Sequence, residues 1–408
     1  MIGYAALLVL AWILSEQRRA IPWRTVLGGV ALQWALAVVL LRVPAARAGV
    51  QALTAGADAL QRATDQGTGF LFGYLAGGTL PFAETAPGAS FILAFKLLPL
   101  VLVISALGAV LFHWGVMQRV VGLFAAGLRR TLGVDGPLAV AAAVHVFVGM
   151  TEAPLLIRAY LGRMQRGELF AVMTCGMAGV AGTVMVIYGI VLDRVLPDAF
   201  GAIITASVIS TPAALAVAAL MVPWATDIDT RGTAVAAPVD AYRAGSTLEA
   251  LVRGTADGVA PLVGIATALI VAVSLVALIN MALGGLPGTP TLQGLLAWPL
   301  RPLVWAIGVP WADAGPAALL LSTKTVLNEF VAYVQLAAMG DSLAPQTRLV
   351  MTYALCGFAN FGSVGILVGS LAVMLPDRQA EVAALGLRSL VGGTIATCMS
   401  GAVAGVLG

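Results

Sequence analysis

Charged residues are scarce in this sequence. Asp, Glu, Lys and Arg make up 10% of the 408 residues, whereas a water-soluble domain normally contains about 25%. Hydrophobic residues account for 60%, and the mean hydropathy is +0.98. Because apolar stretches of roughly 20 residues recur from one end of the chain to the other, its surface cannot face mainly water. The composition therefore predicts a polytopic membrane protein whose main partner is the lipid bilayer.

Residues that serve metal or nucleophilic chemistry are also rare. The chain has two histidines and three cysteines, and no CxxC spacing. It has no GxGD or HExxH pair and no serine–histidine set of the kind that an intramembrane protease or lipid transferase needs. The net charge of +3 leaves no basic run longer than Arg129-Arg130. We therefore expect no enzyme, no cofactor or metal and no nucleic-acid partner. The cysteines, which we interpret as buried small residues, are Cys175, Cys356 and Cys398.

Eight apolar segments predict transmembrane helices in an all-α fold. They are Ile2–Leu14, Val26–Leu41, Phe91–Trp114, Leu169–Leu192, Phe200–Val222, Val259–Leu283, Leu349–Leu375 and Val382–Val406. No basic region precedes the first, so we interpret it as a membrane helix and not a signal peptide. Between the second and third, apolar residues recur at helical spacing from Val50 to Leu60, which predicts a helix lying at the membrane interface.

Two further apolar segments are interrupted by polar residues near their middle. Pro137–Ile157 contains Glu152, and Ala314–Ala337 contains Lys324 and Glu329. Each half of about ten residues rises about 15 Å, half of a bilayer core. We therefore expect two re-entrant hairpins whose tips meet the membrane midplane, since polar backbone at that depth persists only where it lines a cavity.

The distribution of arginines predicts the orientation. If the loop with Arg18, Arg19 and Arg24 is cytoplasmic, fourteen arginines fall on the cytoplasmic side and six outside, while the two lysines lie within the membrane. This bias agrees with the positive-inside rule and places both termini outside.

The order of the segments indicates an inverted repeat. A hairpin and two spans precede a central span, and a second hairpin and two spans follow it from the opposite face; such repeats place a substrate site between them. The expected divisions are 1–65 (N-terminal and interfacial helices, scaffold), 66–136 (third span, scaffold), 137–225 (transport repeat 1), 226–312 (cytoplasmic loop and central span, scaffold) and 313–408 (transport repeat 2). This organisation favours a secondary transporter over a channel.

Carboxylates at both hairpin tips are the strongest chemical signal. Burying Glu152 and Glu329 in a membrane is costly, which favours a functional role; the alternative for Glu329 is a structural ion pair with Lys324. Hydrogen-bond acceptors at both tips suit a neutral substrate rich in hydroxyl and N–H donors. The spans after the hairpins carry glycine-rich interruptions at Gly176–Val184 and Gly357–Ser363, which predict broken helices or, alternatively, close helix packing.

Three segments resemble the signature sequences of the concentrative nucleoside transporters in their short bacterial form. They are Gly149–Leu156, Asn328–Tyr333 and Tyr353–Phe361, and the likeness covers nearly the whole chain. The resemblance implies a homotrimer in the bacterial inner membrane, an elevator-like alternating-access mechanism, and nucleoside import driven by sodium or proton entry.

The resemblance also implies roles for particular residues. The first hairpin tip (Gly149, Met150, Thr151 and Glu152) would bind the base, with Val184 and Phe358 as apolar and aromatic contacts. The ribose would be bound by Glu329, Asn360 and Ser363. Met150 stands where the family usually has glutamine, and its thioether is only a weak acceptor, which leaves the base preference open. A modified nucleoside, a nucleobase or another polar neutral solute remain alternative cargoes.

The coupling site departs further from the family pattern. Sodium-coupled members have an asparagine at the position of His145, with carbonyl donors aligned to Val148, Gly179 and Val180. Sodium favours oxygen ligands, whereas histidine titrates near physiological pH. The sequence thus favours proton symport at His145; sodium symport and an uncoupled facilitator are the alternatives.

Overall fold

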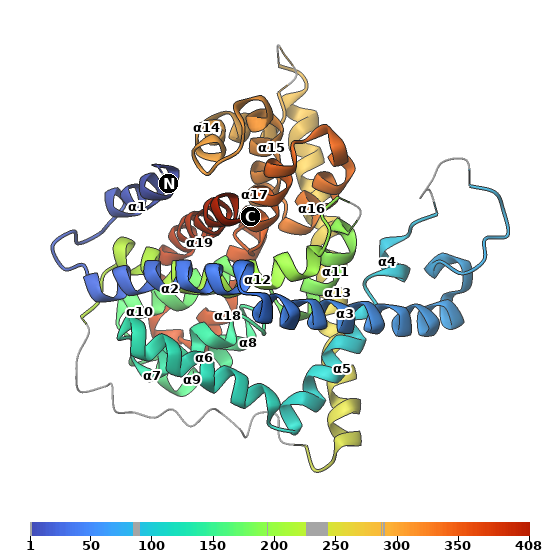
Figure 1. Ribbon diagram of the computed structural model, residues 1–408, viewed down its shortest axis with the longest axis horizontal. Helices are drawn as coiled ribbons and strands as arrows, with labels where there is room; N and C mark the ends of the chain where they lie inside the picture. Colours follow the sequence, from blue (N-terminus) through green and yellow to red (C-terminus); the bar gives the residue numbers. More distant parts are fainter. Residues whose placement is uncertain (1, 85–89, 194, 226–243, 287, 289) are drawn as a thin grey trace.

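The computed structural model describes residues 2–84, 90–193, 195–225, 244–286, 288 and 290–408. Over these ranges the chain folds into helices and connecting turns, without strands (Figure 1). Residues 226–243 of the expected cytoplasmic loop, and with them Arg231 and Arg243, lie outside the described residues, as does Arg194.

The first half of the chain forms α1 Ile2–Ile13, α2 Trp23–Arg42, α3 Pro44–Phe72, α4 Leu93–Lys96, α5 Leu100–His113, α6 Val116–Leu132, α7 Gly136–Val144, α8 Glu152–Leu156, α9 Arg158–Leu161, α10 Arg166–Ala178, α11 Gly182–Leu192 and α12 Ala199–Met221. The second half forms α13 Thr247–Leu283, α14 Leu292–Ala306, α15 Ala314–Val326, α16 Glu329–Met339, α17 Pro345–Leu355, α18 Phe361–Met374 and α19 Gln379–Leu407.

Each expected span overlaps a helix or a pair of helices. Within the described residues, six helical segments are long and apolar enough to cross a membrane, and two shorter apolar helices accompany them at Ile2–Ile13 and Phe361–Met374. The third span is interrupted around Pro99, which lacks the backbone N–H that a continuing helix needs. The central span extends back to Thr247.

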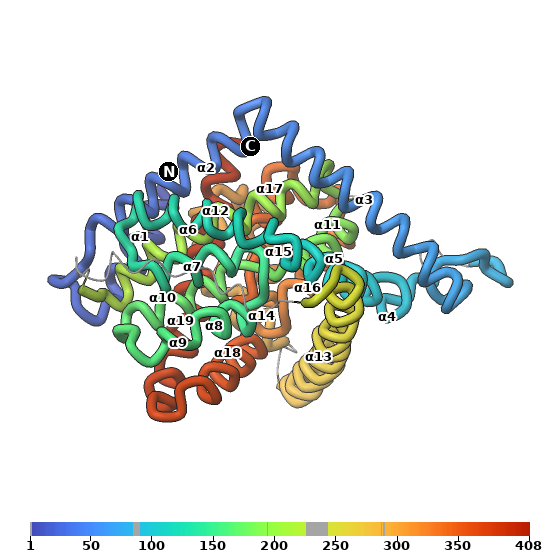
Figure 2. Tube along the Cα trace, turned by 90° about the horizontal axis from the view of Figure 1, so that it is seen from below, coloured from blue at the N-terminus to red at the C-terminus, as the bar shows by residue number. Residues whose placement is uncertain are grey.

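Two helices, α6 and α14, are absent from the predicted elements, and α3 is longer than predicted. The buried residues of α6 recur along one face, at Val121, Ala125, Leu128 and Leu132. A helix of this kind has no continuous apolar run, so a search for spans misses it. In Figures 1 and 2, α3 extends from the body of the molecule and carries α4 near its far end.

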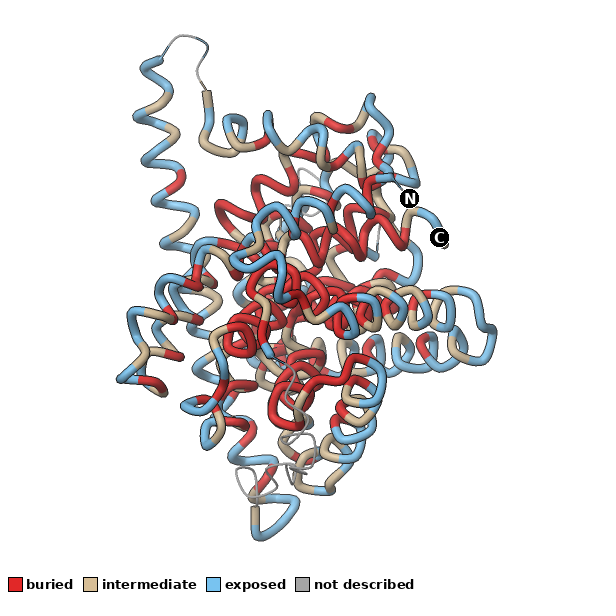
Figure 3. Tube along the Cα trace, turned by 90° about the vertical axis from the view of Figure 1, so that its left-hand side faces the viewer, coloured by how far each residue is buried: buried red, intermediate tan, exposed pale blue. Residues whose placement is uncertain are grey.

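The helices α10, α12 and α19 pack against one another and consist largely of buried residues. Buried residues gather in the middle of the molecule (Figure 3). The helices α1 and α2, expected to belong to the scaffold, pack along α12 and α19. A buried polar chain joins all four: Tyr4 donates to Gln33 (2.7 Å), Gln33 donates to Ser400 (3.2 Å), and Ser400 contacts Ser210 (2.8 Å). Because each group has a partner, the chain fixes how these helices meet.

A second unit is formed by α5 and α13, which pack closely on each other. Gly254 and Gly258 lie directly against Ser105 and its neighbours, and a side chain at either glycine would collide with the backbone of α5. Small residues at such a crossing allow close helix packing in membranes. Most of the large apolar residues of α13 remain exposed in the single chain.

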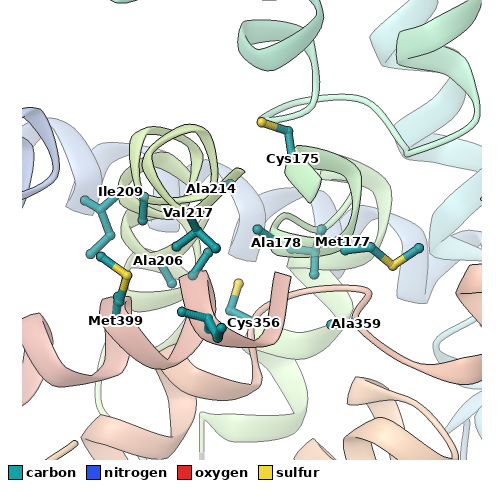
Figure 4. Close-up of a cluster of buried hydrophobic side chains, with 14 of the residues drawn as sticks. Cys175, Met177, Ala178, Ala206, Ile209, Ala214, Val217, Cys356, Ala359 and Met399 are labelled. Atoms are coloured by element: carbon teal, nitrogen blue, oxygen red, sulfur yellow. The ribbon is translucent and has the colours of Figure 1, made fainter. Parts of the chain in front are cut away.

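Both repeats are present as a helical hairpin, a broken helix and a continuous helix. The first consists of α7 with α8 and α9, then α10 with α11, then α12; the second consists of α15 with α16, then α17 with α18, then α19. The breaks meet in an apolar cluster that includes Cys175, Met177, Ala178, Cys356 and Ala359 (Figure 4). All three cysteines are free and buried, as the sequence predicts.

Candidate substrate site between the two hairpins

The tip of the first hairpin is a non-helical turn between α7 and α8. Glu152 begins α8, and its carboxylate lies directly against Gly149, so a side chain at position 149 would displace the carboxylate. Met150 is buried, whereas Thr151 and Glu152 are half-buried. The Glu152 Oε2 atom has no hydrogen-bond partner.

The tip of the second hairpin is held by an N-cap. Asn328 Oδ1 accepts a hydrogen bond from the Val331 N–H (2.9 Å), so that α16 begins at Glu329. Glu329 is only 4% exposed. Its Oε1 accepts a hydrogen bond from the Tyr188 hydroxyl (2.6 Å), and its Oε2 accepts one from Asn360 Nδ2 (3.1 Å). The carboxylate is therefore oriented by one side chain from each repeat's broken helix.

The two broken helices cross at their interruptions. The Phe358 N–H donates to the Gly179 carbonyl (3.1 Å), and the Gly182 N–H donates to the Phe147 carbonyl of the first hairpin (3.1 Å). Asn360 caps α18 by accepting from the Ser363 N–H (2.7 Å). Backbone groups freed by each break thus find partners in the opposite repeat or in the hairpin.

A cavity of about 1590 Å³ lies between the hairpins and extends to α3, α5 and α13. All nine residues expected to bind substrate line it: Gly149, Met150, Thr151, Glu152, Val184, Glu329, Phe358, Asn360 and Ser363. The carboxylates and hydroxyls form a small polar part of a mainly apolar wall, as is usual for sites that bind small molecules.

The four residues expected at the coupling site lie beside this cavity. Val148 lines it, whereas His145, Gly179 and Val180 are buried behind it, with His145 3% exposed. A methyl group placed on Gly176 would lie 3.2 Å from His145 Cε1 and 3.1 Å from Met150 Cβ. The two departures from the family pattern therefore pack against the same glycine.

The imidazole of His145 is only partly satisfied. The ring faces the backbone of Val172, but its Nε2 atom has no hydrogen-bond partner, and neither has the nearby Ser207 Oγ. The Gly179 carbonyl already accepts the Phe358 N–H. A buried, partnerless imidazole nitrogen can bind a proton, and it offers a hard cation a nitrogen where the family has an oxygen.

Two residues of the site region differ from what the sequence indicates. Tyr188, which donates to Glu329, was missed, although it lies four residues after Val184 and so shares a helical face with it. The alternative of an ion pair between Lys324 and Glu329 is wrong: Lys324 Nζ donates to the Ala354 carbonyl (2.9 Å) and to Thr397 Oγ1 (3.0 Å). Among the described residues, no ion pair joins Lys324 to Glu329.

Comparison with protein families gives three matches that together span most of the chain. The model described as "Na+ dependent nucleoside transporter C-terminus" matches residues 202–405, the corresponding N-terminus model matches residues 2–75, and a model described as "Nucleoside recognition" matches residues 94–194. Among individual proteins, an uncharacterized transporter of Haemophilus influenzae is 37% identical, covering 99% of this chain and 96% of its own length. The nucleoside permease NupC of Helicobacter pylori is 33% identical over 99% and 96%.

Solved structures agree with these matches. A structure of CNTnw in an inward-facing substrate-bound state superimposes with a TM-score of 0.89 and 36% identity, covering 100% of this chain and 96% of that one. An outward-facing double variant of CNTnw gives a TM-score of 0.89 at 35% identity, over 100% and 96%. The helical fold and the cavity between two hairpins define an all-α membrane transporter rather than an enzyme. The chain belongs to the concentrative nucleoside transporter family.

Proposed function

We propose that this protein imports nucleosides by symport with protons. The proposal rests on one observation: carboxylates from both hairpins face the same cavity. Glu329, on the second hairpin, is buried and accepts hydrogen bonds from Tyr188 and Asn360. Glu152 Oε2, on the first hairpin, has no hydrogen-bond partner among the described residues. The sugar and the base of a nucleoside present donors that suit these two acceptors. The named nucleoside permease and the substrate-bound CNTnw structure support the same cargo.

The second hairpin would bind the ribose. Each Glu329 oxygen accepts one hydrogen bond within the protein, and an ionised carboxylate offers about four acceptor positions. Lone pairs therefore remain for the hydroxyls of a vicinal diol. Asn360 and Ser363 lie at the start of α18 beside this carboxylate and add groups that donate or accept.

The first hairpin would bind the base. Thr151 and the partnerless Glu152 Oε2 can receive ring or exocyclic N–H groups, while Val184 and Phe358 supply apolar and aromatic surface on the cavity wall. Met150 gives only a weak acceptor. The base would therefore be selected mainly by groups that donate to Glu152 and Thr151, and selection among bases would be broad.

The coupling proton would bind at His145. Sodium fits this site poorly, because the side chain there is an imidazole, which offers a nitrogen where a hard cation favours oxygen. A proton would instead bind at Nε2, the ring nitrogen that lacks a hydrogen-bond partner among the described residues.

The assembly and the motion are part of the proposal. We infer a homotrimer in the bacterial inner membrane with both termini in the periplasm, in which each protomer works by an elevator-like motion of its hairpin repeats. The exposed apolar face of α13 supports an intermolecular contact there. Matches to both inward-facing and outward-facing structures of CNTnw support alternating access.

The test is uptake of labelled uridine and adenosine into proteoliposomes, under a proton gradient alone and a sodium gradient alone. We expect concentrative uptake with protons only. Uptake driven by sodium would support nucleosides as the substrate and reject the proton as the coupling ion. Uptake only down the nucleoside gradient would indicate an uncoupled facilitator. No movement of either nucleoside by folded protein would reject nucleosides as the cargo.

A further inference from the structure

We propose that the Lys324 ammonium is a built-in cation that fixes the broken helix of the second repeat, and through it Phe358 and Asn360, in the position that binds substrate. The account of the substrate rests on the proposed function, whereas the account of the helix does not. Lys324 acts through other residues and is therefore a positioning residue.

Lys324 is the largest charged side chain that is fully buried in the described part of the molecule, with 0% exposure. It lies in the last turn of α15, the first arm of the second hairpin. Its ammonium donates to the Ala354 carbonyl of α17 (2.9 Å) and to Thr397 Oγ1 of α19 (3.0 Å). One charge therefore joins the hairpin, the broken helix and the continuous helix of this repeat.

The carbonyl that it binds belongs to a helix end. The last four carbonyls of a helix lack intrahelical partners and together carry a partial negative charge. The helix α17 ends at Leu355, so the Ala354 carbonyl is one of these groups. Tyr333, from the other arm of the hairpin, donates to the Thr352 carbonyl (2.9 Å). Both arms of the hairpin thus cap the end of α17.

The capped end leads directly into the site. Residues 356–360 separate α17 from α18 and contain Phe358 and Asn360, and Asn360 holds the Glu329 carboxylate. An anchored Ala354 limits where this short segment can go. Without the ammonium, the end of α17 would lose a charge-assisted hydrogen bond in a buried place, and the segment would have more conformations available.

A histidine takes the corresponding place in the first repeat. There the first hairpin arm, α7, is followed by His145, whose ring faces the backbone of Val172 in α10, and Ser207 belongs to α12. The His145 Nε2 and Ser207 Oγ atoms lack partners, whereas the Lys324 ammonium in the second repeat binds both the broken helix and α19. The second repeat thus holds a lysine ammonium at the place where the first repeat would become positively charged only by protonation of its histidine.

The test compares Lys324→Met with Lys96→Met, which removes the only other lysine of the chain. Lys96 lies in α4 against the ring of Phe91, away from α17. Two quantities are measured on purified protein: hydrogen–deuterium exchange of residues 353–360 without ligand, and the ratio of affinities for a nucleoside and its 3′-deoxy analogue, with uridine and adenosine as probes.

We expect Lys324→Met to increase exchange in residues 353–360 by about tenfold or more, from loss of a charge-assisted hydrogen bond. The preference for the nucleoside over its 3′-deoxy analogue should fall from about tenfold to about one, because Asn360 no longer holds Glu329 in place. Lys96→Met should change neither. Unchanged exchange and an unchanged ratio in folded Lys324→Met protein would overturn the proposal.

A milder variant covers the case in which Lys324→Met does not fold. Thr397→Val removes one of the two acceptors and should raise the same exchange by a smaller factor. Thr394→Val, on the same helix, removes a hydroxyl that donates to the Leu390 carbonyl and should not raise the exchange. Equal exchange in both threonine variants would overturn the proposal. If wild-type protein binds no nucleoside, the proposed cargo fails, and the exchange measurement still decides the role of Lys324.

Discussion

The two repeats share the order of hairpin, broken helix and continuous helix. They differ in how far their buried polar atoms have hydrogen-bond partners. In the second repeat, Glu329 accepts hydrogen bonds from Tyr188 and Asn360, and Lys324 donates to Ala354 and Thr397. In the first repeat, Glu152 Oε2 and His145 Nε2 have no hydrogen-bond partner among the residues that the structure describes. The comparison suggests different roles for the two repeats. The second repeat supplies side chains that are already held in place for substrate binding. The first repeat keeps unpaired polar atoms that can bind the base and a proton.

The largest effect is expected from a substitution that disrupts the binding surface of the second repeat. Replacing Glu329 by Gln removes a buried negative charge and makes one of its two acceptors a donor, which faces the Asn360 or Tyr188 donor. Since hydrogen bonds to charged groups contribute about 1.5–3 kcal/mol each, we expect nucleoside uptake to fall by about 100-fold or more. Uptake by proteoliposomes and size-exclusion chromatography would measure activity and assembly. Normal uptake by the folded variant would reject the ribose assignment.

A smaller effect is expected from removing the Tyr188 hydroxyl, which the first repeat contributes to holding Glu329. Tyr188→Phe deletes the hydroxyl that donates to Glu329 and leaves ring contacts with Tyr333 and Phe330 in place. The affinity for nucleosides should fall by about tenfold, as for one charge-assisted hydrogen bond. The control is Tyr160→Phe, at a half-buried tyrosine that is not among the residues lining the cavity. Equal affinities in the two variants would show that Tyr188 does not orient the carboxylate.

Met150→Gln tests whether the tip of the first hairpin selects among bases. An amide at this buried position on the cavity wall both donates and accepts, so it should improve binding of some bases and not others, by about three- to tenfold. Competition of labelled uridine by a panel of nucleosides measures this. A competition profile identical to that of the wild type would make position 150 irrelevant to selectivity.

The smallest effect concerns an ionic cluster around Glu16, which lies in the segment between α1 and α2 and contacts both repeats. Glu16 accepts from Arg166 of the first repeat (3.0 Å) and from Arg388 of the second (2.8 Å), and the hydrogen bond from Arg166 lowers the pKa of Glu16 below its usual value. Because the folded-state pKa is the lower one, the stabilisation is present above the unfolded-state pKa and disappears as the pH falls through the folded-state value.

Glu16→Gln should therefore destabilise the protein slightly at neutral pH, by less than about 1 kcal/mol for a partly exposed pair. The difference in Tm between variant and wild type should shrink toward zero as the pH falls below the lowered folded-state pKa of Glu16, where the carboxyl is protonated in both states. Thermal unfolding in detergent at several pH values measures this, and a difference independent of pH would show that the charge of Glu16 is not the cause.

Much of the fold follows from patterns that are local in the sequence. Apolar runs predicted the long helices, and polar residues within Pro137–Ile157 and Ala314–Ala337 predicted the hairpins, because either pattern has few solutions in a bilayer. The search for apolar runs missed the amphipathic helices α6 and α14. Their apolar residues lie on one face of the helix, and only the packing of that face against the rest of the protein reveals them.

The sequence predicted which residues gather around one cavity, but not the contacts that they make. Nine expected substrate residues line one cavity. The partners of Glu329 and Lys324 were not predictable, because Tyr188, Ala354 and Thr397 are brought to them from distant segments only by tertiary packing. Spacing along the chain suggested the wrong partner for Lys324, its neighbour Glu329.

The most direct test of the account is whether nucleoside addition drives protons through the first repeat. Proteoliposomes loaded with a pH-sensitive dye, in sodium-free buffer, would receive uridine or adenosine, with His145→Asn as the variant. We predict acidification of the lumen by the wild type and none by His145→Asn, with sodium now supporting uptake by the variant because an amide oxygen replaces the imidazole. Concentrative, sodium-dependent uptake by the wild type without proton movement would contradict the account.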